Sequence, residues 1–135
     1  MKTTRFVIGA VLVASAALPA YAHHSFAAEF DINKPVTLSG AVTKLEWANP
    51  HIWVYLDVKD DQGSVQRWQC EGGPPNTLTR NGWSKDSLKF GDQITIEGSL
   101  AKDGSKTCNV RAIKLPDGRS VLAGSSGGDA PPPKR

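Results

Sequence analysis

The sequence lacks the motifs of the common catalytic and nucleic-acid-binding classes. It contains no phosphate-binding glycine loop, no Ser/His/Asp set and no two carboxylates at a spacing that brings them together. Basic residues do not form runs with interleaved aromatics, so a nucleic-acid partner is not expected. No apolar run approaches the ~20 residues that a membrane-spanning helix requires. Catalysis is therefore the weakest interpretation, and no transmembrane segment is expected.

Residues 1–22 have the pattern of a cleaved secretory signal. Lys2 and Arg5 give a basic start, a short apolar run follows, and an A-x-A cleavage signal ends at Ala22. We therefore expect a mature chain that begins at His23 and is periplasmic or secreted. Removal of the signal reduces sixteen basic residues to fourteen against thirteen acidic ones, so the net charge falls from +3 to +1. The remaining charges are those of an ordinary soluble surface.

The other end of the chain does not have a globular composition. Residues 124–135 read GSSGGDAPPPKR, and we expect a disordered tail there because almost nothing apolar can be buried. Residues 23–123 are about the length of one small domain with a single core. No internal repeat divides them.

Within this domain the sequence predicts strands almost throughout. After an N-terminal segment, the expected strands are 36–47, 52–59, 65–71, 93–100 and 107–115. One short helix, Thr77 to Asn81, is expected between the third and fourth strands, with Asn76 as its cap and Gly82 as its stop. That order is typical of an OB-fold, so we expect an all-β, five-stranded OB-fold-like barrel. A small sandwich is the competing architecture, but it would not require the helix. The expected core comprises Val42, Ile52, Val54, Leu56, Ile94 and Ile96.

The second expected strand alternates in a way that separates a core face from an outer face. Ile52, Val54 and Leu56 fall on one face, because side chains alternate along a strand. His51, Trp53 and Tyr55 fall on the other, and with Arg67 of the third strand they make a candidate ligand-binding surface. Such a surface suits a small molecule, an oligosaccharide or a protein partner. The alternative is an ordinary surface strand whose large side chains cover a neighbouring loop.

Cysteine occurs only twice, at Cys70 and Cys108. An even count in an exported protein favours a disulfide, and the absence of C-x-x-C spacing disfavours a redox-active pair. Against the disulfide, Cys70 ends the third expected strand and Cys108 begins the fifth, and parallel pairing would place those ends apart. Because a bridge requires Cα atoms within about 7 Å, the sequence leaves the pairing open.

Three histidines suggest a metal site. Signal cleavage would leave His23 with a free α-amino group beside its imidazole, and His24 follows directly. Together with an imidazole from His51 or His24, these groups would form the three-nitrogen arrangement called a histidine brace. Imidazole and amine nitrogens suit Cu(II) best among the common divalent ions. The alternative is that polar residues after a cleavage site are mobile and that His51 is only a strand residue.

Several motifs in order resemble a family of small exported bacterial proteins. They are HHSFAAEFD, KPVTLSG, WANPH, the segment from PPNTL to GW, GD before the fourth expected strand, and LPDG. The family is a domain of unknown function, number 6152. The resemblance implies an exported, single-domain, barrel-like protein and supplies no activity or catalytic residue.

Two classes of function follow. One is a copper-binding protein that uses His23, His24 and His51. The other is a metal-free module that binds a small molecule, an oligosaccharide or an envelope protein through the face with Trp53 and Tyr55. Copper-dependent oxidation is a third and weaker hypothesis.

Overall fold

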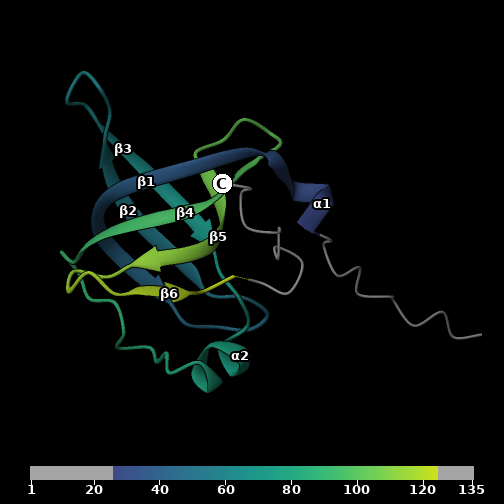
Figure 1. Ribbon diagram of the computed structural model, residues 1–135. Coiled ribbons are helices and arrows are strands. Elements are labelled where there is room, and N and C mark those ends of the chain that lie inside the picture. Colours follow the sequence, from purple (N-terminus) through teal and green to yellow (C-terminus); the bar gives the residue numbers. More distant parts are fainter. Residues whose placement is uncertain (1–25, 125–135) are drawn as a thin grey trace, which may run out of the picture.

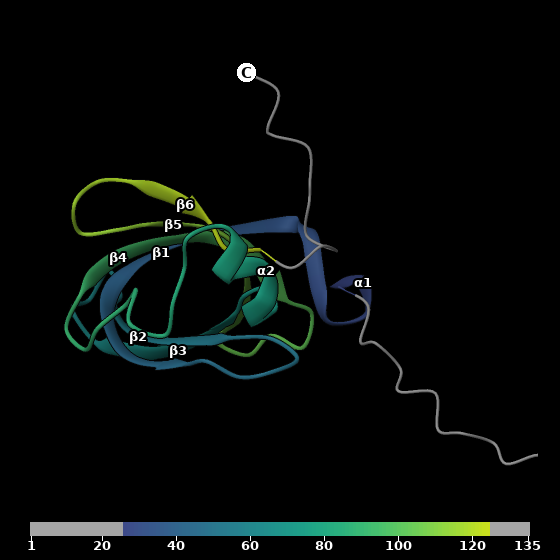
Figure 2. The same ribbon diagram turned by 90° about the horizontal axis from the view of Figure 1, so that it is seen from below.

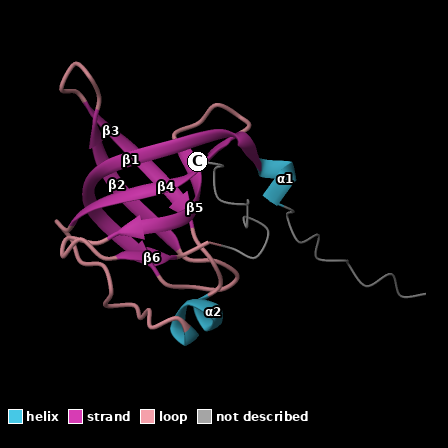
Figure 3. Ribbon diagram, viewed as in Figure 1, coloured by secondary structure: helices cyan, strands magenta, loops and turns pink. Residues whose placement is uncertain are grey.

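The structure, a computed structural model, describes residues 26–124. The predictions for the signal 1–22, for His23 and His24, and for the tail beyond Gly124 fall outside the described residues. The elements are α1 Phe26–Glu29, β1 Phe30–Glu46, β2 Trp53–Lys59, β3 Val65–Glu71, α2 Pro75–Arg80, β4 Gln93–Ala101, β5 Thr107–Lys114 and β6 Ser120–Leu122 (Figures 1 and 3). None of these helices is long and apolar enough to cross a membrane.

The strands close into a ring. The sheet order is β3-β2-β1-β4-β5-β6, and β3 also pairs in parallel with β5, which joins the two sides into a five-stranded barrel. Figure 2 shows β2 and β3 along one side and β4 and β5 along the other. This strand order, with α2 between β3 and β4, confirms the predicted OB-fold-like barrel. The predicted bounds of β2 to β5 agree with the structure to within one residue.

The first strand begins earlier than the sequence suggested. We expected an irregular segment up to Asn33 and a strand from residue 36, but β1 already starts at Phe30. Pro35 lies inside it, at the end of a register shift that begins at Asp31, and such an irregularity is where a strand tolerates proline. Further along, a side chain at Gly40 would place its Cβ 2.1 Å from the Asp57 carbonyl oxygen, so only glycine allows β1 to bend between β2 and β4 here.

The core fills the barrel as predicted. All six residues named from the sequence are at most 3% exposed: Val42, Ile52, Val54, Leu56, Ile94 and Ile96. The helix α2 lies at one end of the ring (Figure 2) and buries Leu78 there. It starts earlier than predicted, because Pro75 rather than Thr77 opens it, and Pro74 takes the cap position assigned to Asn76. Proline's fixed φ suits the first helical position, which explains the difference.

The N-terminal helix α1 is attached to the barrel by aromatic and backbone contacts. Phe30 is buried, and the centroid of the Phe26 ring lies 5.7 Å from that of the Phe30 ring. The N–H of Lys102 in the β4–β5 hairpin donates to the Glu29 carbonyl at 2.8 Å, and the Lys102 ammonium donates to the Ala27 carbonyl at 2.5 Å. Figures 1 and 3 draw this hairpin beside α1. The beginning of the described chain is therefore held beside the hairpin.

The buried and exposed leucines give a matched test of this core. Leu56→Ala should lower the free energy of unfolding by about 2–5 kcal/mol, because transfer energy is lost and a cavity remains. Leu122, on β6, is 70% exposed, and Leu122→Ala should change stability by no more than about 0.5 kcal/mol. Urea denaturation of both variants measures the difference, and equal losses would contradict the barrel core.

Candidate functional site

The outer face of β2 carries the partly exposed imidazole and aromatic rings that the alternation predicted. The even-numbered residues from 52 to 56 are buried, whereas His51, Trp53 and Tyr55 are only partly buried. His51 stands between the cis peptide bond at Pro50 and the start of β2. Two backbone hydrogen bonds hold the next residue, since the Ile52 N–H donates to Gly73 and the Ile52 carbonyl accepts from Gly72. The position of His51 is therefore fixed by the end of β3.

A carboxylate orients the His51 ring. Glu71, the last residue of β3, pairs with Trp53 across the β2–β3 ladder, and its Oε1 contacts Nδ1 of His51. The side chains are 10% exposed for Glu71 and 29% exposed for His51. Because an ionised carboxylate only accepts hydrogen bonds, Nδ1 carries the hydrogen in this contact. Nε2 is then the ring nitrogen that can bind another group.

The disulfide lies directly beside this contact. Cys70 pairs with Cys108 across β3 and β5 with their Cα atoms 4.5 Å apart, and a disulfide joins them. The sequence-based objection was wrong, because the parallel ladder joins only residues 69–71, at the end of β3, to residues 107–109, at the start of β5. The two strands overlap at these ends and do not run side by side over their full lengths.

The same ladder places a second buried polar residue beside Glu71. Asn109 pairs with Glu71 and is 3% exposed. Its approach to β4 depends on Gly98, where a Cβ would lie 1.8 Å from the Asn109 carbonyl oxygen. Among residues 26–124, Glu71 and Asn109 are the buried polar residues. Burial of polar groups is costly unless they are paired, so both side chains require partners at this position.

A cleft of about 670 Å³ opens next to this face. Trp53 and Phe30 contribute aromatic surface, and Ala28 and Ala101 add apolar atoms. The polar lining comes from β3, β5 and the β4–β5 hairpin and includes Gln69, Thr107, Ser105, Asp103 and Lys102. OB-folds bind ligands at the face of strands 2 and 3 and the loops beside it, so the cleft lies where this architecture favours a site.

Hydrogen bonds fix the polar side of the cleft. The Gln69 amide donates to the Thr107 hydroxyl oxygen at 3.2 Å. The Ser105 hydroxyl oxygen lies 2.9 Å from the Thr107 hydroxyl oxygen and 2.6 Å from Oδ1 of Asp103. Hydrogen bonds from the Ser105 hydroxyl and then from its N–H lower the pKa of Asp103, so this carboxylate is ionised at neutral pH. The network presents preorganised donors and acceptors to a polar ligand.

The remaining residues predicted from the sequence lie away from the cleft. The Lys44 ammonium lies 5.3 Å from the centroid of the Tyr55 ring, and the Tyr55 hydroxyl donates to Glu46 at 3.5 Å. A hydrogen bond to Glu46 also raises the pKa of Lys44. Arg67 is exposed and lies nearer the start of β3, two residues before Gln69. Of the three residues proposed for ligand binding, Trp53 lines the cleft, and Tyr55 and Arg67 do not.

Sequence reasoning missed several members of this region. Gln69 and Glu71 were within reach, because they alternate along β3 on the same face as Trp53 and Tyr55. The β4–β5 hairpin and Asn109 were not, since they are brought to this face only by the closure of β3 onto β5. Within residues 26–124, no group of three or more His, Cys, Asp or Glu side chains is arranged to hold a metal ion.

Comparison of the sequence with protein families agrees with the motifs. The profile of the family described as "Family of unknown function (DUF6152)" matches residues 10–110. The chain belongs to this family. The matched region ends within β5. His51 and the residues that line the cleft therefore lie inside it. Comparison with curated proteins gives no significant match.

Two solved structures resemble parts of the fold. A chain in the crystal structure of TiaS with an isoleucine tRNA, AMPCPP and agmatine is 23% identical, with a TM-score of 0.43, over 60% of this chain and 18% of that one. The dimeric N-terminal domain of PriB from Thermoanaerobacter tencongensis is 22% identical, with a TM-score of 0.42, over 62% of this chain and 96% of that one. The chain thus spans less than a fifth of the TiaS-complex chain that it matches. The OB-fold assignment itself rests on the strand order and the ring closure.

Proposed function

We propose that this chain is an exported, periplasmic binding protein that holds a Cu(II) ion with His51 and the histidines of the mature N-terminus, His23 and His24. The observation that carries the proposal is the contact between Nδ1 of His51 and the buried Glu71 carboxylate. Metal-binding histidines almost always donate their second ring N–H to such a group, which fixes the ring and raises its basicity. Nε2 of His51 is then the ligand atom.

The start of the described chain supports the choice of the other ligands. Ala28 of α1 and Trp53 of β2 line the same cleft, and Trp53 is two residues from His51 on the same strand face. In the sequence, His24 stands two residues before Phe26. Because an extended chain spans at most about 3.5 Å per residue, this short spacing limits how far His24 can lie from Phe26. The proposal requires that the amine and imidazole of His23, or the imidazole of His24, meet Nε2 of His51. Amine and imidazole nitrogens together favour Cu(II).

Titration of the processed protein with Cu(II) tests this proposal. His51→Ala should weaken Cu(II) binding at least about tenfold, and Glu71→Gln should weaken it about tenfold, because the group that orients a metal-binding histidine typically contributes that much. A Met residue left before His23 should also weaken binding, because it moves the α-amino group away from the imidazole. Affinity should fall as the pH is lowered, since binding requires unprotonated nitrogens and releases protons.

Two controls keep the result specific. Intact mass must first show that the N-terminus is His23, and Trp53→Phe, which removes no nitrogen ligand, should leave Cu(II) affinity unchanged. Equal Cu(II) affinity in wild type, His51→Ala and the Met-extended protein would show that the histidines form no copper site.

The cleft favours a second candidate function, which is the binding of a polar small molecule such as an oligosaccharide. Trp53 supplies a ring for stacking, and the network from Gln69 to Asp103 supplies donors and acceptors on the other side. Aromatic surface combined with a few fixed polar groups is typical of small-molecule sites. At about 670 Å³ the cleft is large enough for a short oligosaccharide.

Isothermal titration calorimetry with chitotetraose and maltotetraose as probes tests this candidate. Wild type should show saturable binding to one of the probes, and Trp53→Ala should weaken binding about tenfold, in line with a lost stacking contact. Tyr55→Ala is the matched control, because Tyr55 lies on the same face of β2 but does not line the cleft. Absence of saturable binding to either probe, or equal loss in both variants, would contradict the oligosaccharide function without affecting the copper proposal.

A further inference from the structure

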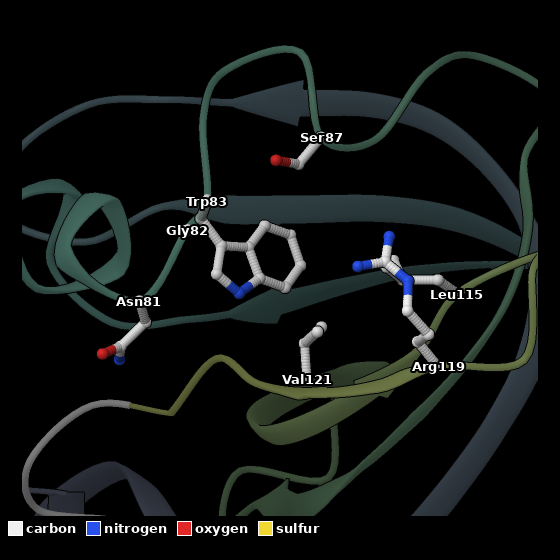
Figure 4. A pocket seen from close by; sticks show the side chains of 7 residues that line it. All are labelled: Asn81, Gly82, Trp83, Ser87, Leu115, Arg119 and Val121. Carbon is white, nitrogen blue, oxygen red and sulfur yellow. The ribbon is translucent and has the colours of Figure 1, made fainter.

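A second pocket lies between the connection that follows α2 and the β5–β6 hairpin (Figure 4). Its volume is about 220 Å³, and it shares no lining residue with the cleft at Trp53. Trp83, Leu115 and Val121 supply apolar surface. Asn81, Ser87 and Arg119 supply the polar lining. This volume is below the roughly 300–1,000 Å³ of typical ligand sites, so only a small compound fits.

Trp83, which lines this pocket, carries a buried donor without a partner. Trp83 is 4% exposed, and its Nε1–H is buried with no hydrogen-bond partner. An indole nitrogen can only donate, so an acceptor oxygen is the group that would satisfy it. Buried donors without partners are rare in native proteins and are unfavourable. In Figure 4 the nitrogen lies on the side of Asn81, an exposed side chain that can turn aside to admit an acceptor.

The other polar groups of the pocket are also rich in donors. The guanidinium of Arg119 donates through Nε to Asp117 at 2.7 Å, and its terminal nitrogens point toward the indole ring in Figure 4. A guanidinium carries five N–H donors, so several remain for another group. The Ser87 oxygen accepts from the Ser84 N–H at 2.8 Å, so in this contact the Ser87 hydroxyl does not use its own hydrogen. The ligand must therefore supply acceptors.

We propose that this pocket binds a small organic acid with a second oxygen acceptor on an apolar body. The body packs against Trp83, Leu115 and Val121, and the terminal nitrogens of Arg119 bind the carboxylate. The second oxygen accepts the hydrogen bond of the Trp83 indole. Arginine is well suited to the carboxylate, because its fork of donors matches two oxygens. This site is separate from the one proposed around His51, so its test does not depend on copper.

Two-dimensional ¹⁵N–¹H NMR of the indole groups tests the proposal, with 4-hydroxybenzoate as the probe. The chain has four tryptophans, and Trp83→Phe identifies the signal of Trp83. That signal should shift saturably on addition of the probe, while the other three stay in place. Arg119→Gln should weaken the affinity about tenfold through the lost charged hydrogen bonds.

The chain offers a matched control for the arginine. Arg111 is also paired with a carboxylate, Glu97 at 2.5 Å, and does not line the pocket, so Arg111→Gln should bind the probe like wild type. The neutral analogue 4-hydroxybenzyl alcohol should bind at least about tenfold more weakly than the acid. The proposal is overturned if the Trp83 signal does not shift saturably, if Arg119→Gln binds like wild type, or if the neutral analogue binds equally well.

Discussion

The parallel pairing of the last residues of β3 with the first residues of β5 is the constraint on which the rest of the structure depends. It converts an open antiparallel sheet into a ring, so the end of β3 is no longer an unpaired edge. Only three residue pairs make this closure, and the middle pair is the Cys70–Cys108 disulfide. The bridge spans a sequence separation of 38 residues, a loop for which restriction of the unfolded chain contributes about 2–4 kcal/mol. The disulfide thus reinforces a ladder of only three residue pairs.

The same closure assembles the candidate site on the outside of the barrel. The residues that follow the two cysteines, Glu71 and Asn109, become neighbours, and Glu71 then holds the ring of His51. The β4–β5 hairpin that leads into β5 forms one side of the cleft and also binds the end of α1. The inner face of β2 carries no such chemistry, because its buried residues, Val54 and Leu56, are aliphatic. The candidate site therefore combines the outer face of β2 with the residues that the closure brings beside it.

The sequence predicted the fold better than the site, and the reason is physical. Alternation along β2 and turn residues such as Gly63 and Gly104, both with positive φ, depend on local preferences that a single sequence displays. The start of β1 was missed because Pro35 normally ends a strand, and the bulge that accommodates it depends on the partner strand β4.

The site required long-range information that the sequence does not display. His51 and Trp53 were found from the outer stripe of β2, and Glu71 was within reach because it alternates along β3 on the same face. Asn109 and the hairpin residues depend on the ring closure. The unpaired indole N–H of Trp83 is a property of packing alone, since the sequence around it indicated only that a helix stops at Gly82.

Peptide mapping by mass spectrometry of the never-reduced protein, prepared from an oxidising compartment, tests the β3–β5 closure most directly. The account predicts a single cross-linked peptide pair that contains Cys70 and Cys108, because the register places these residues opposite each other. Two free thiols in that sample would contradict this closure of the ring.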